Sequence, residues 1–139
     1  MSVRIRQFRI DDYEAAVRLW NTAEGIEIAE GDAKADVALF LKRNAALSQV
    51  AMVGKEIVAV VMCGHDGRRG HIYHLAVAPA FQRRGLAKRL VAECLARLRA
   101  VGIQRAIILV AGDNACGRSF WRSAGWEEIT GALAMGIDV

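Results

Sequence analysis

The sequence predicts a single domain of mixed α/β class, in which one mixed sheet carries helices on both faces. Three observations predict this class. The chain has 139 residues, 54% of them hydrophobic and only one of them proline, which suits one compact core. Segments with strand-like and helix-like hydrophobic spacing follow one another in the order β-α-α-β-β-β-α-β-α-β. The central strand–helix–strand unit, 72–77, 85–100 and 106–110, implies a parallel pair, because such a crossover returns the chain in the same direction.

The N-terminal half is expected to supply two helices and an antiparallel hairpin. Asp11 and Asp12 are suitable helix N-caps, and the apolar residues after them recur at helical spacing. An acidic segment interrupted by two glycines, 24–36, is expected to be mostly loop. The predicted elements are a strand over 3–9, helices over 11–22 and 33–46, and strands over 49–53 and 57–63 joined by the turn 54–56.

The C-terminal half completes the sheet and adds two more helices. Gly102 and Gly125 can take the left-handed conformation that ends a helix. The run AIILV is apolar enough for a strand buried on both faces. The predicted elements are a strand over 72–77, a helix over 85–100, a strand over 106–110, a short helix over 114–124 and a last strand over 129–138. No repeat, linker or low-complexity stretch divides the chain, so we expect one domain over 1–139.

Charge and hydropathy exclude two classes of partner. The net charge is only +4, and the basic residues are scattered from Arg4 to Arg122, which argues against nucleic acid. No stretch approaches the roughly 20 apolar residues that cross a membrane, and the N-terminus lacks the apolar core of a leader peptide. We therefore expect a cytoplasmic protein without membrane contact.

Three cysteines, Cys63, Cys94 and Cys116, are odd in number and far apart in the chain. No CxxC or histidine-rich spacing accompanies them, so the sequence predicts neither a disulfide frame nor a metal site. Buried free thiols are the expected state.

The segment QRRGLAKRL, 82–90, lies between the strand over 72–77 and the long helix. A helix start has unpaired N–H groups and partial positive charge, and Gly85 would let an anion approach them closely. Cations in the first helical turn oppose the dipole unless an anion lies between them. Either this segment binds a phosphate group, or its cations form an ordinary solvated helix start. The GxxxxGK[ST] and GxGxxG motifs are both absent.

The same segment resembles the acetyl-CoA signature of the GNAT superfamily of N-acetyltransferases. Its Q/R-x-x-G-x-G/A pattern appears as Gln82 to Ala87, and the superfamily's L-x-V-x-P element appears as Leu75 to Pro79. Asn114, Phe120 and Gly125-Trp126 are similar to a further segment of the superfamily, and the predicted element order is the same. The resemblance covers nearly the whole chain, looks closest to a small bacterial YpeA-like subgroup, and implies the GNAT fold.

The resemblance implies acetyl-CoA as co-substrate, bound where the strands 72–77 and 106–110 splay apart. Backbone groups of 75–77 would pair with the pantetheine arm and polarise the thioester carbonyl, and 82–88 would hold the pyrophosphate. Asn114 would contact the pantetheine or cap its helix. The residues implied to bind the co-substrate are Leu75, Ala76, Val77, Gln82, Arg83, Arg84, Gly85, Leu86, Ala87, Lys88, Asn114 and Trp121.

An amine that attacks the thioester must first lose a proton, so a base or a water chain is required. The resemblance places His71 at the position of the base, and Tyr73 could orient the acceptor or a water. The alternatives are an exposed histidine at a strand start and a half-buried core tyrosine. Alternation along the strand predicts that both share a face with Leu75 and Val77, and that His74 packs on the opposite face.

Trp121 occupies the position where many members of the superfamily place a tyrosine that protonates the departing thiolate. An indole donates a hydrogen bond but does not titrate near neutral pH. Because a thiolate can leave without full protonation, catalysis need not end, and Trp121 can equally pack against the co-substrate. The sequence therefore leaves open a catalytically weak or idle acyl-CoA-binding regulatory module as the alternative to an enzyme.

The resemblance places the first two helices and their loop beside the acceptor. That loop carries five acidic residues against one lysine, so it would attract a cationic primary amine of a small molecule or a peptide. An ordinary solvated loop is the alternative. A homodimer is common in the superfamily, and no metal is expected.

Overall fold

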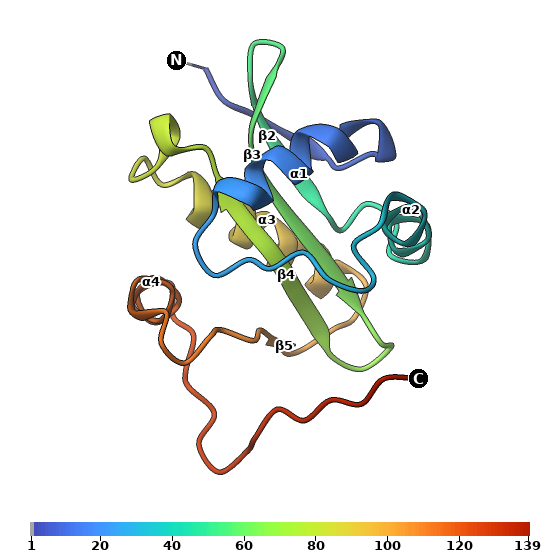
Figure 1. The fold of residues 1–139 in the computed structure, drawn as a ribbon, viewed down its shortest axis with the longest axis vertical. Helices are drawn as coiled ribbons and strands as arrows, with labels where there is room; N and C mark the ends of the chain where they lie inside the picture. Colours follow the sequence, from blue (N-terminus) through green and yellow to red (C-terminus); the bar gives the residue numbers. More distant parts are fainter. Residues whose placement is uncertain (1) are drawn as a thin grey trace. The chain divides into compact units, whose positions relative to one another are not determined.

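The computed structural model describes residues 2–139 as two compact units, the first ending at Ile108 and the second spanning Leu109–Val139 (Figure 1). Whether the two units form the single domain expected over 1–139 stays a prediction.

The first unit is built on one five-stranded mixed sheet in the order β1-β2-β3-β4-β5. The first three pairings are antiparallel, and β4 pairs with β5 in parallel, as the strand–helix–strand pattern predicts. The strands are β1 (Arg4–Gln7), β2 (Gln49–Val53), β3 (Glu56–His65), β4 (Gly70–Val77) and β5 (Ala106–Ile107).

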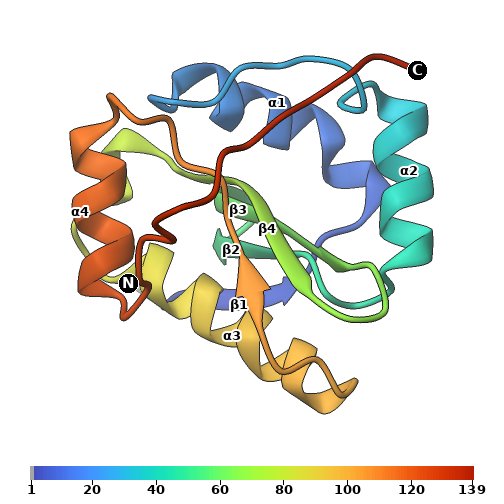
Figure 2. The ribbon, with the colours of Figure 1, turned by 90° about the horizontal axis from the view of Figure 1, so that it is seen from below.

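Helices cover both faces of this sheet, which confirms the predicted fold class. A 3-10 turn (Ile10–Asp12) leads into α1 (Tyr13–Thr22), which covers one face together with α2 (Lys34–Arg43). The opposite face carries α3 (Leu86–Ala100) (Figure 2).

The core has two parts, one on each face of the sheet, because alternate residues of a strand point to opposite faces. Val60 and Met62 of β3 belong to the cluster that contains the fully buried Trp20 of α1. Cys63 is also buried but does not belong to that cluster, and it neighbours the thiol of Cys94 from α3 on the other face. Burial of apolar side chains on both faces is the main force that holds this sheet between its helices.

An ion pair joins β1 to the start of α1. The guanidinium of Arg6 donates to both carboxylate oxygens of Asp12 at 2.8 and 2.9 Å, and Asp12 also accepts from the backbone N–H of Arg9. Burial alone would raise the pKa of Asp12, but these hydrogen bonds outweigh it and hold the pKa below its usual value.

A β-bulge interrupts β4. Val60 pairs with Ala76 and Met62 pairs with Tyr73, so two residues stand between the pairs on β4 where β3 has one. His74, inside the bulge, has a φ of 50°. The predicted alternation is therefore wrong beyond Tyr73, because the additional residue exchanges the two faces from there onward.

The bulge moves specific side chains to faces that simple alternation does not predict. Ala76 lies on the same face as Tyr73, toward α1 and α2, while Val77 pairs with Ala59 on the face of α3. His74 also turns toward α1, since its ring lies 5.0 Å from that of Trp20. The expected separation of Tyr73 and His74 onto opposite faces is not observed.

The strand predicted over 106–110 is shorter in the structure, and the one predicted over 129–138 is absent. The β4–β5 ladder ends at His71↔Ile107, and without a paired neighbour 108–110 leave strand geometry. Residues 129–138 have alternating apolar side chains but no partner strand to satisfy their backbone groups. Leu133, Met135 and Ile137 are about nine-tenths exposed as a result.

The second unit contains one helix, α4 (Ala115–Ser123). Asn114 caps it, because its Oδ1 accepts from the N–H of Gly117 at 3.0 Å. A Cβ on Gly117 would lie 2.5 Å from the Asn114 side chain, so the tight cap requires glycine there.

Candidate functional site

The candidate site begins at the outer edge of β4. The N–H of Ala78 donates to Val58 of β3 at 2.8 Å, so the backbone groups of the preceding residue, Val77, point away from β3. The Val77 carbonyl accepts from Gln82 Nε2 at 3.0 Å, in agreement with that direction. Since β5 pairs with β4 only as far as His71, no described strand pairs with this edge at 75–77.

The chain then turns sharply into α3. A 3-10 turn (Pro79–Phe81) is followed by Arg83 at φ 62° and by Gly85 at φ 80°, which is the N-cap of α3. No side chain caps this helix, and a Cβ placed on Gly85 would meet nothing within 4 Å. The first-turn N–H groups of α3 therefore have no side-chain partner, and the space beside Gly85 is open.

Positive charge surrounds this helix start. Arg83, Arg84, Lys88 and Arg89 are exposed, and none of them forms an ion pair within 4 Å with any residue of 2–139. The guanidinium of Arg84 lies over the ring of Phe81, 5.4 Å from its centroid. Four cations and a helix N-terminus without an acidic partner favour an anionic ligand.

Two residues of the predicted segment have different surroundings from the cations. Leu86 is buried in the core, so only its backbone can face a ligand, and Ala87 is half-buried. The structure places the whole predicted segment, 82–88, next to the free edge of β4.

His71 and Tyr73 lie together on β4, as the sequence predicts. Their rings are stacked at 5.9 Å with an interplanar angle of 19°. Tyr73 also contacts Phe40 of α2 edge to face, yet 42% of it remains exposed, so it is not a closed core residue. Partial burial raises the pKa of Tyr73, which keeps the phenol protonated at neutral pH.

The structure also brings together a pair that sequence reasoning missed. His74 Nε2 lies 3.0 Å from each carboxylate oxygen of Asp32, which comes from the α1–α2 loop. No local pattern in the sequence signals this pair, because its members are 42 residues apart and the bulge alone turns His74 toward the loop.

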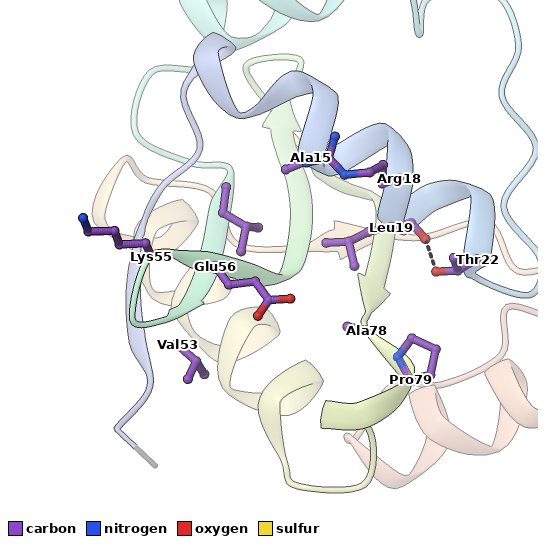
Figure 3. Close-up of a pocket in the computed structure, with 10 residues that line it drawn as sticks. Ala15, Arg18, Leu19, Thr22, Val53, Lys55, Glu56, Ala78 and Pro79 are labelled. Carbon is purple, nitrogen blue, oxygen red and sulfur yellow. Dashed lines mark hydrogen bonds between the residues drawn. The ribbon is translucent and has the colours of Figure 1, made fainter.

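A groove lies close to the candidate site. Its volume is 780 Å³, and it lies between α1, the β2–β3 hairpin and the end of β4 at Ala78 and Pro79 (Figure 3). Arg18, Lys55 and Glu56 supply its charged side chains. None of the residues that the sequence predicts for the site lines this groove.

The remaining two predicted residues, Asn114 and Trp121, belong to the second unit. The Asn114 side chain caps α4, which confirms one of its two expected roles. Trp121 contacts Phe120 and Trp126 edge to face, with centroids 5.1 and 5.0 Å apart. This aromatic cluster leaves the indole only half-buried.

Among residues 2–139, no group of three or more acidic, histidine or cysteine side chains is placed to hold a metal ion. Within the same range, no helix is both long and apolar enough to cross a bilayer.

Comparison with known proteins decides the family. The model of the acetyltransferase (GNAT) family matches residues 5–126. The chain belongs to the GNAT family. This GNAT chain is 32% identical to Acetyltransferase SG1711 of Sodalis glossinidius over 134 residues, 96% of the chain and 94% of that relative. It is 38% identical to Acetyltransferase ECA0875 of Pectobacterium atrosepticum over 112 residues, 81% and 79% of the two chains.

Solved structures share the fold of this GNAT protein at low sequence identity. The PaiA N-acetyltransferase of Thermoplasma acidophilum, in complex with coenzyme A, has a TM-score of 0.75 at 18% identity, over 88% of each chain. AAC(6')-Iy, in complex with a bisubstrate analogue, has a TM-score of 0.81 at 18% identity, over 100% of both. The ribosomal-protein-S18-alanine N-acetyltransferase of Escherichia coli has a TM-score of 0.76 at 20% identity, over 93% and 80%. The protein is thus an acetyltransferase of an acetyl-CoA-dependent family.

Proposed function

We propose that this protein transfers the acetyl group of acetyl-CoA to a primary amine of a small molecule or peptide, by direct attack of the amine. One observation supports this most: the free outer edge of β4 leads, within eight residues, into the glycine-capped and cation-rich start of α3. An extended chain and a pyrophosphate are the two parts of a ligand that such a pair of features can bind.

The residues of the first unit fit acetyl-CoA in two places. At 75–77, β4 can donate and accept hydrogen bonds as it would toward an added strand, with the Val77 backbone directed outward. At α3, Gly85 leaves open the space in front of the helix N–H groups. Arg83, Arg84 and Lys88 supply cations that a pyrophosphate would neutralise. The roles of Asn114 and Trp121 toward the ligand stay predictions.

The chemistry would be carried by β4. Bound acetyl-CoA supplies an activated carbonyl, and a backbone N–H at the free edge of β4 would stabilise the negative charge that develops on its oxygen. Tyr73, protonated at neutral pH, could donate to the acceptor or to a water. His71 is the base that the resemblance indicates, and a second histidine of β4 competes with it, as argued below.

The acceptor would approach beside the α1–α2 loop. Glu24, Glu27 and Glu30 are exposed there and would attract a cationic amine. Asp32 does not belong to this exposed rim, because it is buried against His74. Among the structural neighbours, AAC(6')-Iy binds the bisubstrate analogue CoA-S-monomethyl-acetylneamine, and another protein is a ribosomal-protein-S18-alanine N-acetyltransferase. The fold therefore supports both a small-molecule and a protein acceptor.

Placement in the YpeA-like subgroup is proposed only on the motifs LW (19–20), GxDGxRG (64–70) and YxLxVxPxFxxRG (73–85). A homodimer and a cytoplasmic location stay predictions of the same kind.

The proposal is tested by thiol detection with acetyl-CoA and a panel of small-molecule and peptide amines. We expect thiol release that depends on the amine, and stabilisation against heat by acetyl-CoA. Absence of any stabilisation at millimolar acetyl-CoA would contradict the binding site. Stabilisation without thiol release would favour the alternative, an acyl-CoA-binding regulatory module, for which Trp121 in place of the usual tyrosine is the supporting feature.

A further inference from the structure

We propose that His74 is the general base that deprotonates the acceptor amine, and that Asp32 is the positioning residue that holds it in the reactive tautomer. This inference rests on the proposed function, because it assigns the base of that reaction.

The contacts of His74 define a histidine–carboxylate pair. Its Nε2 lies 3.0 Å from both oxygens of Asp32, whose side chain is 12% exposed. Asp32 is fixed in turn: its Oδ2 accepts from the N–H of Ala29 at 3.0 Å, and its carbonyl accepts from the phenol of Tyr13 at 2.7 Å. The acid is therefore a rigid partner from a separate segment of the chain.

This geometry selects one tautomer of the neutral ring. An ionised carboxylate only accepts hydrogen bonds, so Nε2 must carry the proton and Nδ1 keeps its lone pair. Among residues 2–139, the buried side-chain nitrogens and oxygens without a partner are Trp20 Nε1 and Gln49 Oε1. Nδ1 of His74 is not among them, and no hydrogen bond to it is found in this range, so this nitrogen is not fully buried and its lone pair can accept a proton.

The backbone at His74 is held in an uncommon conformation. Its φ of 50° lies in the left-handed region, which costs a non-glycine residue on the order of 1 kcal/mol. The ring packs on Trp20 at 5.0 Å, so neighbouring groups hold both the backbone and the side chain. Such conformations cluster at functional sites, where surrounding contacts sustain them.

The position of His74 suits a base in this reaction. It directly precedes 75–77, the free edge proposed to bind the thioester arm, and it touches the α1–α2 loop proposed to admit the amine. His71, the base expected from the sequence, stacks on Tyr73 and has no acidic partner within 4 Å among the described residues. Of the two histidines, His74 alone is both oriented and polarised.

The groups around the ring are few. From the loop, Asp32 is the acidic contact; from α1, Trp20 contributes an apolar ring and Tyr13 acts through the Asp32 carbonyl. From β4, the neighbouring Tyr73 is directed toward Phe40 of α2. Asp32 is therefore the one charged side chain found in contact with the His74 ring among the residues that the structure describes.

The protons balance in the proposed step. Nδ1 takes one proton from the substrate ammonium and passes it to solvent, and the amine lone pair then attacks the acetyl carbonyl carbon. The C–N bond forms, the C–S bond breaks, and sulfur leaves with the electron pair. The second nitrogen proton goes to the thiolate, so the products are the amide, the thiol and one released proton.

The test compares His74→Gln, Asp32→Asn, His71→Gln and the control His65→Gln, a histidine at the end of β3 whose Nδ1 accepts from the N–H of Gly67. Glutamine can still donate to Asp32 but cannot titrate. We expect His74→Gln to lower kcat/KM for alkylamines by roughly 10²–10⁴-fold and to remove the contribution of the histidine to the acidic limb of the pH–rate profile, which then follows the ionisation of the amine alone. For an amine that is already unprotonated at neutral pH, His74→Gln should lower kcat/KM far less. The control His65→Gln should change neither kcat/KM nor the pH–rate profile.

A second measurement addresses the pair without turnover. Long-range 1H–15N spectra of the unliganded protein should show His74 as the Nε2–H tautomer, and Asp32→Asn should convert it to a mixture of tautomers. An Nδ1–H tautomer in the wild type overturns the inference. A histidine contribution to the acidic limb that is lost in His71→Gln and retained in His74→Gln also overturns it and assigns His71. A wild type that binds acetyl-CoA but releases no thiol overturns the proposed function instead, whatever the tautomer.

Discussion

Replacing Gly85 by alanine separates the binding role of the α3 N-cap from its role in folding. Gly85 has a φ of 80°, where a Cβ costs about 1–2 kcal/mol of stability, and its surroundings are open, so no steric clash adds to that cost. Gly102, at the other end of α3, has a φ of 89° and equally open surroundings. The two substitutions should therefore destabilise the protein by similar amounts.

Only Gly85→Ala should weaken acetyl-CoA binding. The methyl group would stand before the helix N–H groups and disturb charge-assisted hydrogen bonds worth about 1.5–3 kcal/mol, which corresponds to roughly a tenfold to hundredfold rise in Kd. Calorimetric titration gives the affinities, and thermal unfolding gives the stabilities. Equal affinities in Gly85→Ala and Gly102→Ala would refute the assignment of this helix start as the pyrophosphate site.

Three further predictions concern stability and thiol chemistry. Asp12→Asn should lower the free energy of unfolding by about 1–3 kcal/mol, measured in urea at pH 7. Because folding lowers the pKa of Asp12, the difference between wild type and variant should shrink as the pH falls through that pKa. A difference that stays constant with pH would contradict the stabilising role of the ion pair. Asn114→Ala should cost about 1 kcal/mol through the lost cap of α4, measured by loss of helical signal on heating. Iodoacetamide should modify the exposed Cys116 in the native protein, with Cys63 and Cys94 reacting only after unfolding, because both are buried and Cys94 has a raised pKa.

The elements that have a strong local signal were predictable. Hydrophobic spacing gave α1 and α3 nearly to the residue, and Gly85 marked the start of α3 because few other residues tolerate its backbone conformation. The gathering of 82–88 beside β4 followed from the strand–helix order alone.

The predictions that were wrong or missing concern features set by contacts between residues far apart in the sequence. Alternation within β4 could not reveal the bulge, since bulge position is set by pairing with β3 and no glycine marks it. The His74–Asp32 pair depends on that bulge and therefore could not be predicted from the sequence. The apolar alternation of 129–138 is a genuine strand signal, but a strand forms only where a neighbour satisfies its backbone.

The bulge in β4 has a consequence for how this enzyme's relatives can diverge. A residue inserted between Tyr73 and Ala76 is not committed to a cross-strand pair, so its side chain can change without altering the register on either side. If 75–77 bind the acetyl donor as proposed, position 74 can vary with the acceptor while those three residues stay the same. Under these proposed roles, β4 would keep acetyl-CoA recognition and the choice of base mutationally independent, although the two sites lie one peptide bond apart.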